Sequence, residues 1–175
     1  MRKVLVIGSP GSGKSVFSRT LGKLTGLPVI HLDQHYWRAG WVEPSKDEWD
    51  KQLDELLRRD SWIIDGNYSR TMDRRLEYCD TVIFIDFPKH LCTWRVLKRA
   101  LRFSDRPDLA AGCDERFDLR FLRWTWNFPK RSRARVVERL ERVGEKMSVV
   151  RLTTTREVED LLSALASRFN NENGN

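Results

Sequence analysis

Residues 8 to 15 read Gly8-Ser9-Pro10-Gly11-Ser12-Gly13-Lys14-Ser15, which matches the pattern G-x-x-x-x-G-K-[S/T] at every fixed position. The apolar run at residues 4–7 precedes this stretch and is typical of a buried parallel strand. Apolar residues at helical spacing follow it over residues 16–24, and Gly26 then provides a stop signal. A strand, a glycine-rich loop and a helix in this order form the context in which the pattern binds phosphate.

The residue types in this loop explain how it would hold a nucleotide. Glycines let the backbone turn so that successive N–H groups point at a phosphate, and the start of the next helix adds a positive end. Lys14 can reach the β- and γ-phosphates, and the Ser15 hydroxyl can ligate Mg²⁺. We therefore predict ATP and Mg²⁺ as cofactors. The predicted nucleotide contacts are Gly8, Ser9, Pro10, Gly11, Ser12, Gly13, Lys14, Ser15 and Val16.

The composition is that of an ordinary globular protein. The chain has 175 residues, of which 40% are hydrophobic and 33% charged, so we expect one domain over residues 1–170 and a disordered polar tail at 171–175. No apolar run approaches the roughly 20 residues of a membrane helix. Three cysteines without metal-ligand spacing argue against a disulfide framework and favour a cytoplasmic location.

Basic residues are concentrated in one part of the chain. Residues 87–142 contain 15 Lys and Arg against 7 Asp and Glu, a net charge of +8, whereas the whole chain carries +7. This segment could be a lid that clamps nucleotide phosphates or a patch that binds nucleic acid, and a solvated face accounts for some of its residues. The sequence has no helix-turn-helix, zinc-finger or RNA-binding signature for the second interpretation.

Apolar runs alternate with helical patterns along the rest of the chain. Strands are predicted at residues 28–32, 62–64, 81–85 and 148–152, and capping boxes at 45–48 and 154–157 open two of the helices. Together with the first strand, this alternation predicts an α/β fold with three α/β/α layers and a five-stranded parallel sheet. Ligands in such sheets bind beyond the carboxyl ends of the strands. The polar residues expected there, besides the loop, are Asp33, Asp65, Asp86 and Thr153.

Two of these carboxylates are the strongest candidates for chemistry. Asp33 and Asp65 each follow an apolar strand, where a carboxylate can hold a Mg²⁺-bound water or accept a proton from an attacking hydroxyl. The alternative for both is a helix cap or a turn former. Asp86 precedes Phe87-Pro88, and the start of a helix is its simpler interpretation.

Arginines and tryptophans supply the remaining candidates. Arg95 and Arg99 lie four residues apart on one helix face, where an anion between them would relieve their repulsion; two solvated arginines are the alternative. Arg70 and Arg74 carry the same ambiguity. Trp37, with Trp41, lies in a glycine-containing stretch and could stack on a ring or serve structurally.

At this level of detail the chain resembles the small P-loop kinases of the adenylate kinase and shikimate kinase type. Within them it is most similar to bacterial DNA topology modulation (FlaR-like) proteins. The resemblance extends over nearly the whole chain. The motifs that carry it are Leu32-Asp33-Gln34-His35-Tyr36-Trp37 with Gly40-Trp41, Trp62-Ile63-Ile64-Asp65-Gly66-Asn67-Tyr68, residues 84–99 and residues 112–124.

The resemblance implies roles for several residues. The Asp-Gly pair of adenylate kinases organises Mg²⁺, a role that falls on Asp65, and their arginines after the helix-opening proline match Arg95 and Arg99. In adenylate kinases the pair is followed by Phe-Pro-Arg, and this arginine binds the acceptor phosphate. Here the corresponding arginine is Arg70, which lies one position later in the sequence. Asp33 and the nearby Tyr36 are similar to the catalytic base and tyrosine of uridine-kinase-like relatives.

The resemblance also assigns two regions. Residues 102–135 correspond to a basic helical lid that brings arginines onto the phosphates, and residues 34–60 correspond to the acceptor-binding region. The candidate lid arginines are Arg106, Arg116, Arg120 and Arg123.

We therefore predict an ATP- and Mg²⁺-dependent phosphotransferase that acts on a small acceptor, with nucleotides and nucleosides as candidates. The alternative is an ATP-binding regulator associated with DNA topology. The oligomeric state cannot be derived from the sequence. The predicted catalytic residues are Lys14, Asp33, Arg95 and Arg99, the substrate contacts are Asp33, Tyr36, Trp37, Asn67 and Arg70, and the metal ligands are Ser15 and Asp65.

Overall fold

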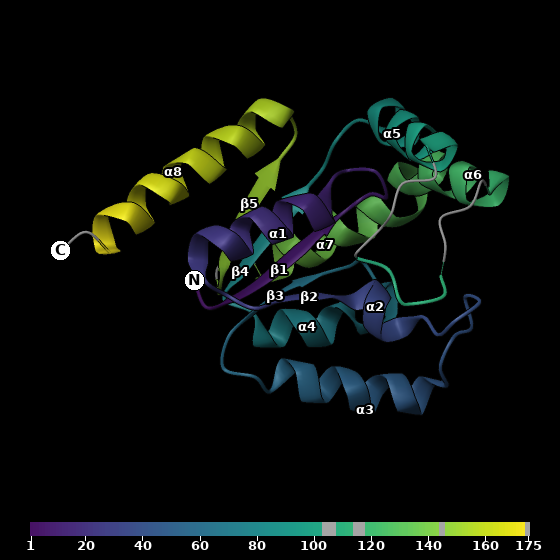
Figure 1. The fold of residues 1–175 in the computed structure, drawn as a ribbon, viewed down its shortest axis with the longest axis horizontal. Helices are drawn as coiled ribbons and strands as arrows, with labels where there is room; N and C mark the ends of the chain where they lie inside the picture. Colours follow the sequence, from purple (N-terminus) through teal and green to yellow (C-terminus); the bar gives the residue numbers. More distant parts are fainter. Residues whose placement is uncertain (103–107, 114–117, 144–145, 174–175) are drawn as a thin grey trace.

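The computed structural model of the chain describes residues 1–102, 108–113, 118–143 and 146–173 (Figure 1). The described residues form a five-stranded, fully parallel sheet with the strand order β2-β3-β1-β4-β5. The strands are β1 (Lys3–Gly8), β2 (Val29–His31), β3 (Trp62–Asp65), β4 (Thr81–Ile85) and β5 (Ser148–Leu152).

Helices connect the strands and cover both faces of the sheet (Figure 1). The α-helices are α1 (Lys14–Thr25), α2 (Leu32–Tyr36), α3 (Lys46–Leu57), α4 (Met72–Tyr78), α5 (Lys89–Arg102), α6 (Leu119–Phe128), α7 (Ala134–Val143) and α8 (Thr155–Asn173). A 3₁₀ turn, η1 (Ser69–Thr71), precedes α4, and a π-helical turn, η2 (Pro129–Arg133), joins α6 to α7.

Alternating side chains of the strands build a core on each face. Leu5 and Ile7 of β1 pack with residues of α3, α4 and α7, whereas Val4 and Val6 pack with residues of α1 and α8. All four side chains are fully buried, as expected for the central strand of a parallel sheet. The predicted three-layer α/β/α fold is therefore confirmed.

Helix boundaries follow the local signals for the most part. Gly26 ends α1 in the left-handed conformation, and Ser45 and Glu48 form the predicted capping box of α3.

Cys79, Cys92 and Cys113 are buried and not disulfide-bonded. None of the helices among the described residues is both long and apolar enough to cross a membrane.

Two local predictions were wrong. The chain leaves the sheet at His31, so Asp33 lies inside the short helix α2 and does not directly follow the strand. Helix α8 continues to Asn173, so most of the predicted tail at 171–175 is helical backbone; residues 174–175 lie outside the described part.

Candidate active site

The glycine-rich loop connects β1 to α1 at the carboxyl edge of the sheet. Gly8 and Gly11 have no room for a side chain, because an added Cβ would lie 2.4 Å from the Ile85 carbonyl oxygen and 2.2 Å from the Cys92 carbonyl oxygen, respectively. Gly11 also has φ +75°, which favours glycine. The loop is thereby packed against β4 and α5, and Lys14 opens α1.

A cavity of about 860 Å³ lies at this edge of the sheet. This volume is near the upper end of the roughly 300–1,000 Å³ range of ligand pockets, so it offers room for more than one small ligand. Gly8, Ser9 and Ser12 are buried in the loop and do not line the cavity. The predicted site residues that line it are Pro10, Gly11, Gly13, Lys14, Ser15, Val16, Asp33, Trp37, Asp65, Asn67, Arg95 and Arg99.

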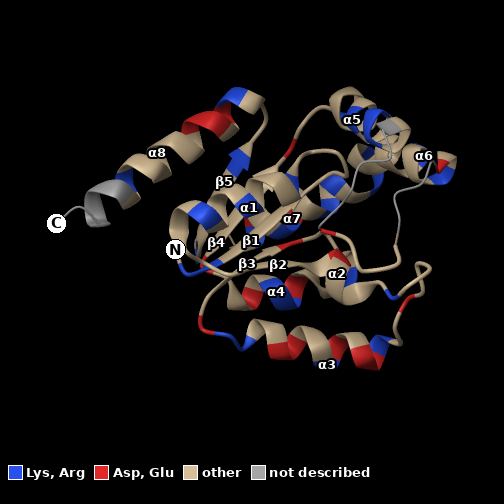
Figure 2. Ribbon diagram, in the orientation of Figure 1, with Lys and Arg blue, Asp and Glu red and all other residues tan. Residues whose placement is uncertain are grey.

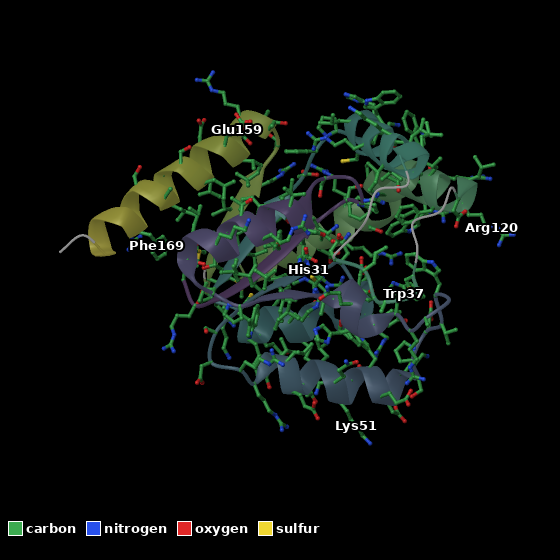
Figure 3. The ribbon with its side chains drawn as sticks, in the orientation of Figure 1. His31, Trp37, Lys51, Arg120, Glu159 and Phe169 are labelled. Carbon is green, nitrogen blue, oxygen red and sulfur yellow. The ribbon has the colours of Figure 1, made fainter. Side chains whose placement is uncertain are left out.

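Asp65 is held by a histidine. Its Oδ2 lies 2.9 Å from Nδ1 of His31, and both side chains are buried. The two residues are register partners in the β2–β3 pairing, which places both at the carboxyl edge of the sheet (Figure 3 labels His31). His31 belongs to no metal-ligand pattern in the sequence. Its contact with Asp65 depends on the strand order, which is not visible in the sequence.

The oxygen donors present fit a magnesium ion. Ser15 supplies a hydroxyl and Asp65 a carboxylate to the same cavity, and Mg²⁺ prefers oxygen ligands, few of them from protein and the rest from water and substrate phosphates. Within the described residues, no group of three or more His, Cys, Asp or Glu is arranged to hold a metal ion.

The loop after β3 is tied to the phosphate loop. The Asn67 side chain accepts a hydrogen bond from the Gly8 N–H (3.1 Å) and donates one to the Gly8 carbonyl (2.5 Å). The guanidinium of the fully buried Arg75 donates to the carbonyls of Gly66 (2.6 Å), Asn67 (2.5 Å) and Tyr68 (2.9 Å). Burial lowers the pKa of Arg75 to about 9, so it remains a cation at neutral pH.

Asp33 is oriented by a tyrosine that the sequence did not single out. The Tyr68 hydroxyl donates to Asp33 Oδ1 at 2.7 Å. Burial, followed by the neighbouring Asp33 carboxylate, raises the pKa of Tyr68, so the hydroxyl keeps its proton. Tyr68 has φ +24°, a strained value for a non-glycine residue, and its ring packs on Tyr36 and Trp49.

Two arginines of α5 lie at the cavity that the glycine-rich loop also lines. Arg95 and Arg99 both line the cavity. The Arg95 guanidinium lies 3.5 Å from the Ser12 carbonyl oxygen and 3.4 Å from the Thr155 hydroxyl, and its carbon lies 5.2 Å from the centre of the Phe87 ring. These contacts fix the arginine beside the predicted phosphate position.

Two predicted substrate residues lie outside the main cavity. Arg70 makes a bidentate ion pair with Asp50 (2.9 and 2.7 Å), and this hydrogen bonding raises the pKa of Arg70. With Tyr36 it lines a smaller cavity of about 260 Å³ that adjoins the main one, since Glu43, Tyr68 and Ser69 line both. The substrate contacts predicted for Arg70 and Tyr36 therefore stay predictions. The ion pair with Asp50 could not be predicted from the sequence, because it depends on the packing of α3. The neighbouring Arg74 pairs with one carboxylate oxygen of Asp54, also in α3.

The lid region contributes aromatic groups where arginines were expected. Phe121, Trp124 and Phe128 of α6 line the cavity, whereas Arg120 and Arg123 are exposed and do not (Figure 3 shows Arg120 at the outer end of α6). The candidates Arg106 and Arg116 lie outside the described residues.

Ion pairs engage several of the basic residues at 87–142. Arg133 of η2 donates to both carboxylate oxygens of Asp86 (2.8 and 3.0 Å), which Arg151 also contacts, so the strand-end carboxylate joins η2 to the sheet. Arg139 pairs with Asp73 at 2.8 Å. Figure 2 shows basic residues on several turns of α5, above the edge that carries the phosphate loop. Part of the positive segment thus lies against the cavity or in ion pairs, whereas Arg120, Arg123 and Arg131 are exposed.

Comparisons of the sequence with known proteins find distant relatives among adenylate kinases. No family model matches the chain. The adenylate kinases of Thermotoga maritima and Thermotoga petrophila are each 25% identical to it over 114 residues, which cover 63% of this chain and 51% of each relative. The chain therefore spans about half the length of the curated relatives it matches.

Solved structures share the fold more completely. A gluconokinase from Sinorhizobium meliloti 1021 matches with a TM-score of 0.54 and 13% identity, over 96% of this chain and 91% of that protein. A sugar kinase from Janibacter sp. HTCC2649 matches with a TM-score of 0.51 and 16% identity, over 98% and 93%. The fold and these similarities place the chain among proteins with the P-loop kinase architecture.

Proposed function

We propose that this protein transfers the γ-phosphoryl group of ATP to a hydroxyl group of a small acceptor. The observation that carries the proposal is the convergence of Lys14, Ser15, Asp33, Asp65 and the α5 arginines on one cavity. Phosphoryl transfer needs mainly positioning and charge stabilisation. The weak similarity to adenylate kinases and the fold shared with sugar kinases support the same reaction class.

Each residue has a role in this proposal. Lys14 and the loop N–H groups neutralise charge that builds on the phosphoryl oxygens, and Arg95 and Arg99 stabilise the transferred group. The acceptor oxygen forms the new bond to the γ-phosphorus, the bond to the bridging oxygen breaks, and ADP leaves. Asp33, held by Tyr68, accepts the proton of the acceptor hydroxyl.

The remaining assignments rest on the same site. Ser15 and Asp65 would hold Mg²⁺, which would supply positive charge that neutralises the phosphate oxygens. We place residues 34–60 at the acceptor and residues 102–135 over the nucleotide as a lid. On its sequence motifs, we place the chain nearest to the DNA topology modulation proteins among kinase-like proteins.

Production of ADP tests the proposal. The protein is incubated with ATP, Mg²⁺ and a panel of nucleosides, nucleoside monophosphates and hydroxylated metabolites, and ADP release and acceptor phosphorylation are measured. We expect turnover with at least one acceptor, and its loss by a factor of about 10³ or more in Lys14→Ala, whose circular dichroism spectrum should match the parent. Turnover that survives this substitution would show that the phosphate loop is not the catalytic site.

The panel also separates the kinase from the DNA-associated alternative. Tight ATP binding without phosphorylation of any acceptor, together with salt-dependent binding of duplex DNA, would favour the regulator. Acceptor phosphorylation without DNA binding at low salt would exclude it.

A further inference from the structure

We infer that the acceptor is an uncharged or cationic hydroxylated molecule with a planar ring, of which a nucleoside is the nearest class, and that phosphorylated or carboxylated acceptors are disfavoured. This inference rests on the proposed function and concerns the acceptor end of the same cavity. Three features of that end support it: the distribution of charge, the engagement of its arginines, and its aromatic wall.

The described cations of the cavity gather on one side, whereas carboxylates line it in several places, with Asp65, Asp108 and Asp118 besides Asp33 and Glu43. Among the described lining residues, the cations come from α1 and α5, on the phosphate-loop side of the cavity: Lys14, Arg19, Arg95 and Arg99. The segments that follow β2 contribute Asp33 and Glu43. An anionic acceptor bound beside Asp33 would therefore face carboxylates, and such like-charge contacts cost several-fold to many-fold in affinity.

Four described arginines of the segments around β2 and β3 are engaged by other partners. Arg70 is held by Asp50 and Arg74 by Asp54, both carboxylates of α3. Arg38 pairs with Glu48 at 3.1 Å, and Arg75 is buried against backbone carbonyls. None of these four lines the cavity, so this part of the described structure offers no guanidinium for an acceptor phosphate.

Aromatic rings form the wall beside Asp33. Trp37 and Trp41 line the cavity, and their ring centres lie 5.4 Å apart with the planes at 68°. Across the cavity, α6 presents Phe121 and Trp124, which stack with their centres 5.7 Å apart and their planes at 30°. Flat faces of this kind bind planar rings well because they lose little conformational freedom.

Trp41 has a strained backbone conformation, and such conformations are common at functional sites. Trp41 has φ +65°, a conformation that costs on the order of 1–3 kcal/mol for a bulky residue and persists only when its surroundings fix it. Hydrogen bonds between Arg38 and Val42 close the turn (2.9 Å), and the Gly40 N–H donates to the Gly112 carbonyl (2.9 Å). The turn is thus fixed against the segment that precedes α6.

Paired acceptors test this inference. We would measure kcat/KM with ATP and Mg²⁺ for nucleosides against their own 5′-monophosphates, and for glucose against gluconate. The inference predicts that a nucleoside is the best acceptor and exceeds its monophosphate by about 100-fold or more. A preference for a monophosphate over its nucleoside, or for gluconate over glucose, would overturn the inference and leave the kinase proposal standing. A preference for glucose over every nucleoside would have the same consequence. No phosphorylation of any compound would overturn both.

A charge reversal provides an independent test. Glu43 is exposed, so Glu43→Lys should fold normally, and it should raise the activity ratio of monophosphate to nucleoside by about tenfold or more. Glu43→Gln should raise the ratio less, and Glu55→Lys, on an exposed position of α3 outside the cavity, should leave it unchanged. An identical ratio in Glu43→Lys and Glu55→Lys would contradict the proposed acidic acceptor end.

Discussion

At the scale of single residues, the Asn67 side chain links the loop after β3 to the phosphate loop. Its amide both accepts from and donates to the backbone of Gly8, the first residue of the phosphate loop. Although Asn67 lines the cavity, as expected for a substrate contact, its polar atoms are used to position the loop.

This geometry predicts the effect of Asn67→Ala. Loss of two hydrogen bonds should loosen the start of the phosphate loop and raise the Kd of an ATP analogue about tenfold, which corresponds to about 1.4 kcal/mol. Calorimetric titration measures this change in Kd. Asn127→Ala is the matched control, because among the described residues the Asn127 side chain donates to the carbonyl of Arg123 in its own helix. A changed acceptor KM with an unchanged nucleotide Kd would instead identify Asn67 as a substrate contact.

At the scale of secondary structure elements, α4 stabilises the strained loop after β3. Arg75 of this helix is fully buried and satisfies three consecutive carbonyls, those of residues 66–68. Those carbonyls belong to the loop that carries Asn67 and Tyr68. Helix α4 therefore holds the loop that carries Tyr68, and Tyr68 in turn positions Asp33 through a hydrogen bond.

Removal of this guanidinium should be strongly destabilising. Arg75→Met leaves three carbonyls without their donor, and we expect the free energy of unfolding to fall by about 3 kcal/mol. Urea unfolding measures the loss. Arg74→Met removes the adjacent arginine, whose ion pair with Asp54 is only partly buried, and should cost about 1 kcal/mol. Equal losses in the two variants would contradict the role assigned to Arg75.

At the scale of the whole molecule, the sheet and its phosphate loop follow from local sequence signals. Buried strands, capping boxes and the glycine-rich loop are each encoded within a few neighbouring residues, as Ser45 and Gly26 illustrate. The parts that could not be predicted depend on contacts between distant segments. The contact between His31 and Asp65 requires that β2 lies beside β3. The ion pair between Arg70 and Asp50 requires that α3 packs beside η1.

The lid shows the same limit. Arginines that contact the nucleotide phosphates were expected between residues 102 and 135, and this expectation stays a prediction. Composition alone could not show that Arg133 reaches Asp86, whereas Arg120 and Arg123 are exposed. The strained φ angles of Trp41 and Tyr68 also leave no trace in the sequence, because the surrounding structure imposes them.

The most direct test of this account is calorimetric titration of the protein with a non-hydrolysable ATP analogue in the presence of Mg²⁺. We predict one binding site per chain with a Kd on the order of micromolar, and a Kd at least about 100-fold higher for Lys14→Ala, since the loop N–H groups and Lys14 together hold the phosphates. Absence of binding heat at millimolar analogue, or equal affinity in the two proteins, would contradict the claim that the β1–α1 loop binds the triphosphate.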